Sequence, residues 1–195
     1  MIETIRKRFE ESIGILRLAA EHLAGRNVQA VELIADCRHA GGGVFLFGNG
    51  GSAADAQHIA GELVGRFLRE RSALRAEALT TDSSVLTCIA NDYDFEQVFA
   101  RQLEGKARGG DVAIALTTSG GSPNVVAGLR KARQMQMKTI AFTGGGGGRC
   151  AELADVLLDV PCSGSSPRIQ EAHCVLYHIL CELLEAKLFD EAPRR

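Results

Sequence analysis

The stretch Gly48-Asn49-Gly50-Gly51-Ser52-Ala53-Ala54-Asp55-Ala56-Gln57-His58-Ile59-Ala60-Gly61-Glu62 decides the fold. It follows the apolar run 44–47, which is typical of a strand buried on both faces of a parallel sheet. Ser52 is a good helix N-cap, and the alanines after it favour a helix. The pattern predicts a strand, a glycine turn and a helix. Free backbone N–H groups and the positive end of the helix dipole then meet at the turn, where they suit a phosphate or sugar hydroxyls.

The same predicted helix carries His58 and Glu62 four residues apart, so both side chains lie on one face. Such a pair is either a solvent-exposed contact or part of a metal or acid–base site. Gln170 and His178 lie at helical spacing in a later segment. Together the four residues offer nitrogen and oxygen donors that zinc accepts. From these residues alone, a core histidine is the simpler interpretation of His178, because apolar residues flank it.

A second polar loop, Thr117-Thr118-Ser119-Gly120-Gly121-Ser122, precedes Pro123, and a serine before a proline is typical of a helix start. Its hydroxyl and N–H groups form a phosphate-binding nest in one interpretation and an ordinary Ser/Thr-rich turn in the other. Neither this loop nor 48–52 has the spacing of a Rossmann or Walker motif, which argues against nucleotide binding.

The remaining chain alternates predicted helices and strands. Strands are predicted over 44–47, 76–80, 112–116, 139–143 and 156–160, and helices over 1–24, 28–38, 52–68, 84–89, 94–107, 123–136, 150–154 and 169–188. Alternation of this kind predicts an α/β fold with right-handed crossovers, a five-stranded parallel sheet flanked by helices, and ligands beyond the carboxyl ends of the strands. We expect one domain over 1–195, with N-terminal helices (1–40), an α/β core (41–192) and a tail from Pro193 to Arg195.

The first predicted helix carries an apolar stripe at steps of three and four, which needs a partner from this chain or from another subunit. Its members are Ile2, Ile5, Phe9, Ile13, Leu16, Ala20 and Leu23. The stripe makes residues 1–40 the expected oligomerisation segment.

The composition excludes several functional classes. With 22 basic and 24 acidic residues, the chain has no basic field for nucleic acid or for a membrane surface. No apolar run approaches the roughly 20 residues of a transmembrane helix. The six cysteines include no CxxC pair, so buried thiols of a cytoplasmic protein are the favoured interpretation.

Taken together, these motifs resemble the sugar-isomerase (SIS) domain family, and within it the phosphoheptose isomerases. The resemblance covers nearly the whole chain and rests on GNGGSAADAQH with GELVGRF, LTTDSS with IANDYDFEQVF, GDVAIALTTSGGSPNV, and RIQEAH with a later histidine. It implies a flavodoxin-like parallel sheet and a homotetramer with active sites between subunits. It also implies an enzyme that converts D-sedoheptulose 7-phosphate to D-glycero-D-manno-heptose 7-phosphate. This is the first step toward nucleotide-activated heptoses for lipopolysaccharide core or surface glycans.

The resemblance also implies roles for individual residues. One Zn²⁺ per subunit would be held by His58, Glu62, Gln170 and His178. In an enediol mechanism, Glu62 is the candidate base and His178 the candidate acid. Substrate contacts are expected from Asn49, Gly50, Gly51, Ser52, Glu62, Asn91, Asp92, Thr117, Thr118, Ser119, Ser122 and Gln170. The run Gly144–Gly148 departs from the charged turn usual in the family, and we expect only local flexibility from it.

Two other functional classes remain open. One is a non-catalytic tetrameric relative that binds a replication-initiator partner; such relatives lose the Glu/His pair that Glu62 and His178 preserve here. The other is a sugar-phosphate-sensing domain of a transcriptional regulator. Such domains usually accompany a DNA-binding module, for which 195 residues leave no room.

Overall fold

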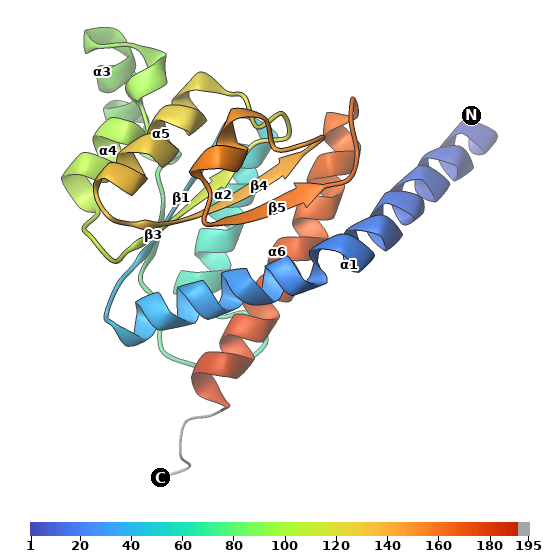
Figure 1. Ribbon diagram of the computed structural model, residues 1–195, viewed down its shortest axis with the longest axis horizontal. Helices are drawn as coiled ribbons and strands as arrows, with labels where there is room; N and C mark the ends of the chain where they lie inside the picture. Colours follow the sequence, from blue (N-terminus) through green and yellow to red (C-terminus); the bar gives the residue numbers. More distant parts are fainter. Residues whose placement is uncertain (191–195) are drawn as a thin grey trace.

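The sheet has five parallel strands in the order β2 (Ala76–Ala78), β1 (Val44–Gly48), β3 (Val112–Leu116), β4 (Lys138–Gly144) and β5 (Val156–Val160). A computed structural model describes residues 1–190 (Figure 1). The strand order is the flavodoxin-like one, in which the direction of winding reverses between β1 and β3. The predicted fold class is confirmed, and all five predicted strands are present.

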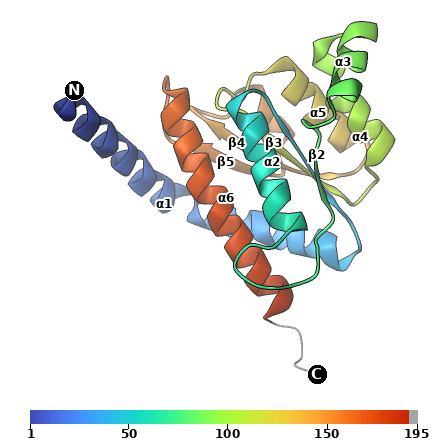
Figure 2. The same cartoon turned by 180° about the vertical axis from the view of Figure 1, so that it is seen from behind.

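Side chains of the strands alternate between the two faces of the sheet, and each face has its own apolar core. Val44 and Leu46 pack against α1 (Ile2–His39), α2 (Gly51–Val64) and α6 (Ser166–Phe189). Phe45 and Phe47 pack on the opposite side. The elements there are α3 (Ser83–Asp92), η1 (Phe95–Gln97), α4 (Ala100–Lys106), α5 (Pro123–Gln134) and η2 (Gly148–Leu153). Figure 2 shows α2 and α6 side by side on the first face.

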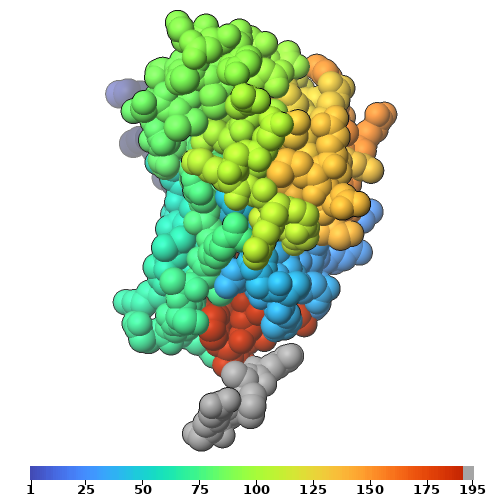
Figure 3. Space-filling view, turned by 90° about the vertical axis from the view of Figure 1, so that its left-hand side faces the viewer, coloured from blue at the N-terminus to red at the C-terminus, as the bar shows by residue number. Residues whose placement is uncertain are grey.

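The N-terminal segment forms one helix, α1 (Ile2–His39), and the predicted break between two helices is wrong. Near the expected break, Asn27 is buried, and its side-chain amide donates a hydrogen bond of 3.1 Å to the Leu176 carbonyl of α6. This contact holds the helix against α6 where the sequence suggested a turn. Figure 3 shows the C-terminal ends of α1 and α6 next to each other on one side of the molecule.

The N-terminal half of α1 projects away from the sheet (Figures 1 and 2). Ile2, Ile5 and Phe9 of the apolar stripe are each more than half exposed, whereas Leu23, nearer the sheet, is buried. A polar contact joins this half to the start of α6, because the Ser12 hydroxyl donates 2.7 Å to the Glu171 carboxylate. Within residues 1–190 the first part of the stripe therefore stays open to solvent.

Other boundaries differ locally from the predictions. Helix α2 begins at Gly51, with Gly50 rather than Ser52 at the cap position, and it ends at Val64 instead of residue 68. The helix predicted over 94–107 is two elements, η1 and α4, and the one predicted over 150–154 is the 3₁₀ helix η2. All four glycines of 145–148 have positive φ, a conformation that L side chains rarely adopt.

The predicted tail from Pro193 to Arg195 and the last two residues of the predicted core lie outside the described residues. In the part of the chain that the structure describes, no helix combines the length and the apolar character needed to span a bilayer. The six cysteines are unpaired there. The prediction that they are buried thiols holds for Cys37, Cys150 and Cys181 but is wrong for Cys88, which is exposed.

Candidate functional site

The loops after β1 and β3 meet at the point where the winding of the sheet reverses, the usual ligand position in this topology. They enclose a pocket of about 190 Å³ lined by Asn49, Ser52, Leu116, Thr117, Thr118, Ser119 and Ser122. Six of these seven residues were predicted to contact the substrate. The N-termini of α2 and α5 both begin at these loops, so two positive helix ends favour an anion in the pocket.

Hydroxyl groups dominate the β3 side of this pocket. The Thr117 Oγ1 lies 3.3 Å from Ser122 Oγ and 3.4 Å from Ser119 Oγ, and Ser119 Oγ accepts a hydrogen bond from the Gly121 N–H. Ser122 is the residue before α5, as predicted, although its hydroxyl points to Thr117 instead of capping the helix. The cluster offers a phosphate several donors without a lysine.

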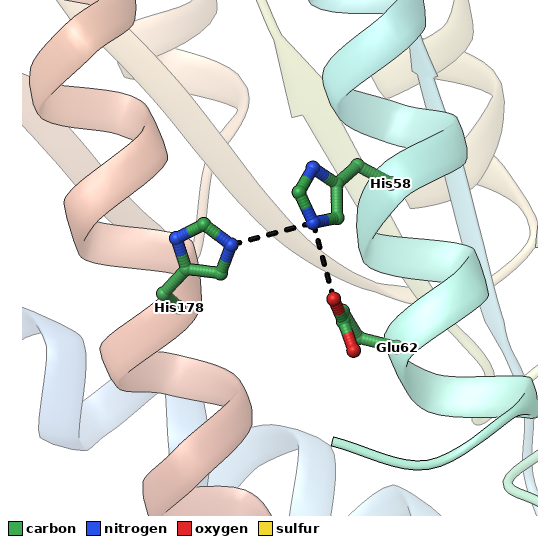
Figure 4. Close-up of side chains that lie close together, drawn as sticks. All are labelled: His58, Glu62 and His178. Atoms are coloured by element: carbon green, nitrogen blue, oxygen red, sulfur yellow. Dashed lines mark hydrogen bonds and ion pairs between the residues drawn. The ribbon is translucent and has the colours of Figure 1, made fainter. Parts of the chain in front are cut away.

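Further along α2, His58 and Glu62 face His178 of α6 (Figure 4). His58 Nε2 lies 3.1 Å from Glu62 Oε1 and 3.3 Å from His178 Nε2. Among the described residues, these three present ligand atoms within 4.8 Å of one another. The interpretation of His178 as a core histidine is therefore wrong, because its ring points across to α2.

The two contacts of His58 Nε2 fit neighbouring ligands of a tetrahedral metal. Zinc–nitrogen bonds of about 2.0–2.1 Å place neighbouring tetrahedral ligand atoms about 3.3 Å apart, close to the contacts His58 makes with its two partners. A single proton on His58 Nε2 cannot serve both Glu62 and His178. A cation between the three groups satisfies all of them, since each then offers a lone pair.

Gln170, the fourth predicted ligand, lies closer to the β1 loop. Its side-chain N–H donates a 2.8 Å hydrogen bond to Asp55, one turn before His58 on α2. A Cβ added at Gly51 would come within 2.5 Å of this amide, so the glycine permits the close approach. Burial raises the pKa of the Asp55 carboxyl, although the hydrogen bond from Gln170 and the charge of His58 oppose this shift.

Aromatic side chains hold the two histidine rings in place. The ring of Phe67 stacks on His178, with centroids 6.0 Å apart and planes at 19°. The ring of Tyr177 meets His58 edge to face at 5.4 Å, and its hydroxyl lies 3.3 Å from His58 Nδ1. Burial raises the pKa of Tyr177.

Asn91 and Asp92 do not line the pocket. They lie exposed at the end of α3, where the Asn91 amide donates to Asp92 at 2.9 Å and the Cys88 thiol lies 3.4 Å from the same carboxylate. Both hydrogen bonds lower the pKa of Asp92, and the one from Asn91 has the larger effect. Their predicted contact with the substrate stays a prediction.

Three residues at the site were not predicted. Asn124 forms a paired amide contact with Asn49 beside the pocket, Asp55 holds Gln170, and Tyr177 touches His58. Asp55 carries a sequence signal, because it lies one turn before His58 on the same helix face. The signals for the other two residues are weaker. Asn124 is a polar residue directly after Pro123, and Tyr177 carries the single hydroxyl of an apolar helical run.

Comparison with known proteins places these features in a family. The family model described as SIS domain matches residues 9–144. The chain is 52% identical over 185 residues to the phosphoheptose isomerase of Aquifex aeolicus, covering 95% of this chain and 96% of that one. It is 47% identical over 191 residues to the phosphoheptose isomerase of Geotalea daltonii, covering 98% and 99%.

Solved structures of phosphoheptose isomerases share the fold of this chain. The phosphoheptose isomerase from Neisseria gonorrhoeae superposes with a TM-score of 0.89 at 42% identity, covering 94% of this chain and 98% of that one. The counterpart from Francisella tularensis gives a TM-score of 0.90 at 35% identity, covering 94% and 97%. Since both sequence and fold match over almost their full lengths, the chain belongs to the phosphoheptose isomerases of the SIS-domain family.

Proposed function

We propose that the chain is an intramolecular oxidoreductase that converts D-sedoheptulose 7-phosphate to D-glycero-D-manno-heptose 7-phosphate. Such a reaction is the first step toward nucleotide-activated heptoses for lipopolysaccharide core or surface glycans. The observation that carries the proposal is an anion pocket at the start of α2 and, further along the same helix, His58 and Glu62 facing His178 of α6. The chain's membership of the phosphoheptose isomerases supports D-sedoheptulose 7-phosphate as the substrate.

The spacing along α2 suits a sugar phosphate. From Ser52 in the pocket to His58, six residues at 1.5 Å per residue cover about 9 Å of helix axis. A heptose 7-phosphate carries its phosphate at one end and the reacting carbons C1 and C2 at the other. With the phosphate among the hydroxyls of the β3 loop, the reacting end extends toward His58, Glu62 and His178.

The reaction moves one proton between neighbouring carbons. Glu62 takes a proton from C1 of the ketose and returns it to C2, and His178 handles the proton that passes between the two oxygens. One carboxylate oxygen of Glu62 faces His58, and Figure 4 shows the other turned away from both histidines, where it has room to act as a base. Hydroxyls of the pocket hold the phosphate and fix the register of the sugar.

One Zn²⁺ per subunit is the expected cofactor, held by His58, Glu62, His178 and the amide oxygen of Gln170. The Gln170 oxygen is the appropriate donor because its amide nitrogen already binds Asp55. When bound, zinc polarises a carbonyl and stabilises negative charge on oxygen. A carboxylate committed to zinc is a weaker base, so zinc binding and proton transfer compete for Glu62.

We also propose a homotetramer, with active sites between subunits, that covers the stripe of α1. In support, Ile5 and Phe9 are 56% and 67% exposed and stand on one helix face. Phe9→Glu should lower the mass measured by light scattering. Leu18→Glu is the matched control, because Leu18 is also exposed on α1 but lies on the opposite face. An unchanged mass for Phe9→Glu would contradict a subunit interface at this stripe.

A cytoplasmic location is supported by the free thiols, which persist in reducing compartments. Nucleic acid is not an expected partner, since basic and acidic residues nearly balance. The alternative function is a non-catalytic tetramer that binds a replication-initiator partner. It is less favoured because Glu62 and His178 are both present and face the same point.

The deciding experiment is an isomerase assay on sedoheptulose 7-phosphate with the wild type and His178→Ala, each with and without chelator. We expect turnover by the wild type that His178→Ala abolishes. Loss of turnover with chelator, and recovery with zinc, would support the metal. A folded, zinc-loaded wild type without turnover would contradict the enzyme and favour the partner-binding alternative.

A further inference from the structure

The hydroxyl of Tyr177 lies in the interior between α2 and α6, next to the proposed zinc ligands. The Tyr177 side chain is 2% exposed. Its oxygen lies 3.3 Å from His58 Nδ1 on α2 and donates to Cys174 Sγ, also at 3.3 Å, on α6. A phenylalanine would fill the same space, so the hydroxyl requires its own explanation: buried hydroxyls are retained where they are hydrogen-bonded.

We propose that Tyr177 is a positioning residue that fixes the ring of His58, and the nitrogen carrying its proton, for metal binding. The inference rests on the proposed zinc site. A neutral histidine that binds a metal through Nε2 carries its proton on Nδ1, and that proton needs an acceptor. For His58 the acceptor is the Tyr177 oxygen.

The second histidine completes the same pattern. His178 Nδ1 lies 3.7 Å from Cys174 Sγ, the sulfur that also accepts from Tyr177. With protons on both Nδ1 atoms, His58 donates to Tyr177, His178 donates to Cys174, and Tyr177 donates to Cys174. Both Nε2 lone pairs are then free, and with Glu62 they form a group of ligand atoms within 4.8 Å of one another, as a shared cation requires.

The contact also fixes the distance between two helices. His58 belongs to α2, whereas Tyr177 and Cys174 belong to α6, so the hydroxyl links the two elements that supply the ligands. Without it, His58 Nδ1–H loses the acceptor that holds the ring in this orientation. The ring then favours the other tautomer, which places a proton where the metal should bind.

The test is the zinc affinity of purified Tyr177→Phe, measured by competition with a chromophoric chelator. Groups that hydrogen-bond to metal ligands typically contribute roughly 10–100-fold to metal affinity, so we expect a loss of about that size. Tyr93→Phe is the matched control, because Tyr93 is exposed on the far side of the sheet. Its zinc affinity should equal that of the wild type.

A purely structural role gives a different result. In that case Tyr177→Phe would lower the melting temperature of the metal-free protein and leave zinc affinity unchanged, which would overturn the inference. Cobalt provides an independent readout, because a displaced His58 alters the visible absorption of the Co²⁺-loaded protein. A wild type that binds neither zinc nor cobalt would overturn both this inference and the proposed metal site.

Cys174 variants keep the inference testable if Tyr177→Phe does not fold. Cys174→Ser retains an acceptor for His178 and Tyr177, whereas Cys174→Ala removes it. We expect zinc affinity near the wild-type value for the serine variant and a clear loss for the alanine variant. Equal affinities in the two variants would contradict the proton arrangement.

Discussion

The side chains of Asn49 and Asn124 face each other across the sheet's switch point and exchange two hydrogen bonds, each of 2.8 Å. Asn49 belongs to the loop after β1, and Asn124 to the first turn of α5 after the hydroxyl loop. Asn124 is buried, and its oxygen also accepts from the Val125 N–H. The pair therefore joins the two loops that form the anion pocket.

Asn124→Ala should weaken substrate binding, because it leaves the Asn49 amide unpaired and frees the two loops. Losing a buried hydrogen-bond partner costs about 1–3 kcal/mol, so we expect KM for the sugar phosphate to rise roughly tenfold with a smaller change in kcat. Asn27→Ala is the control, since Asn27 is also buried and its amide donates to the Leu176 carbonyl, but it lies between α1 and α6. It should lose similar stability with KM unchanged. An unaltered KM in Asn124→Ala would show that the pair only supports the fold.

Glu62→Gln should fold normally and lose kcat by roughly 10²–10⁴-fold, the usual contribution of a positioned base. The amide keeps the size of the side chain and a contact with His58 but cannot accept the proton. Glu182→Gln, an exposed position on α6, should retain wild-type kcat. Zinc content measured on the same samples separates loss of the base from loss of the metal. Near-normal turnover by Glu62→Gln would contradict the assignment of Glu62 as the base.

Much of this arrangement follows from local patterns in the sequence. Runs such as 112–116 are apolar throughout because a central parallel strand is covered on both faces, so the strands and the two loops after β1 and β3 were predictable. His58 and Glu62 share a face by helical periodicity alone. The His58–Glu62 part of the site therefore comes from one short segment of the chain.

Features that depend on packing between distant segments were not predictable. The meeting of His178 with His58 depends on α6 lying beside α2, 120 residues away in sequence. The continuity of α1 past Asn27 depends on a contact with α6, and the early end of α2 depends on Arg71, which donates to the Leu63 carbonyl. Each is a tertiary contact that overrides a local signal.

His173 should make the protein less stable in acid. Its side chain is fully buried, and burial lowers its pKa to about 4 although its hydrogen bond to the Thr143 carbonyl opposes the shift. The unfolded chain takes up this proton below about pH 6.5, whereas the folded protein resists until about pH 4. Stability is therefore retained above about pH 6.5 and falls by up to about 3 kcal/mol as the pH drops toward 4.

Urea denaturation of His173→Gln between pH 4 and 7 checks this. The variant should show a flatter dependence of unfolding free energy on pH, since glutamine does not titrate. His22→Gln, at an exposed position of α1, should follow the wild-type curve. If His173→Gln and the wild type lose stability in parallel on the acid side, other groups control the acid sensitivity.

The last prediction concerns a buried ion pair that holds the end of α2 against α6. Arg71 and Glu185 lie 3.3 Å apart, and each side chain is 3% exposed. Arg71 donates to the carbonyls of Glu62 and Leu63 in the last turn of α2. Glu185 accepts from two backbone N–H groups of the loop that follows, at Phe67 and Leu68.

Glu185→Ala should cost about 3–5 kcal/mol of unfolding free energy, because the Arg71 charge stays buried without its partner. Glu182→Ala, on the exposed side of the same helix, should change stability by less than about 0.5 kcal/mol. Since Arg71 binds the carbonyl of Glu62 itself, loss of the pair should also loosen the proposed base and lower kcat at temperatures where the protein remains folded. A stability near that of the wild type would mean that solvent reaches Arg71 and replaces the carboxylate.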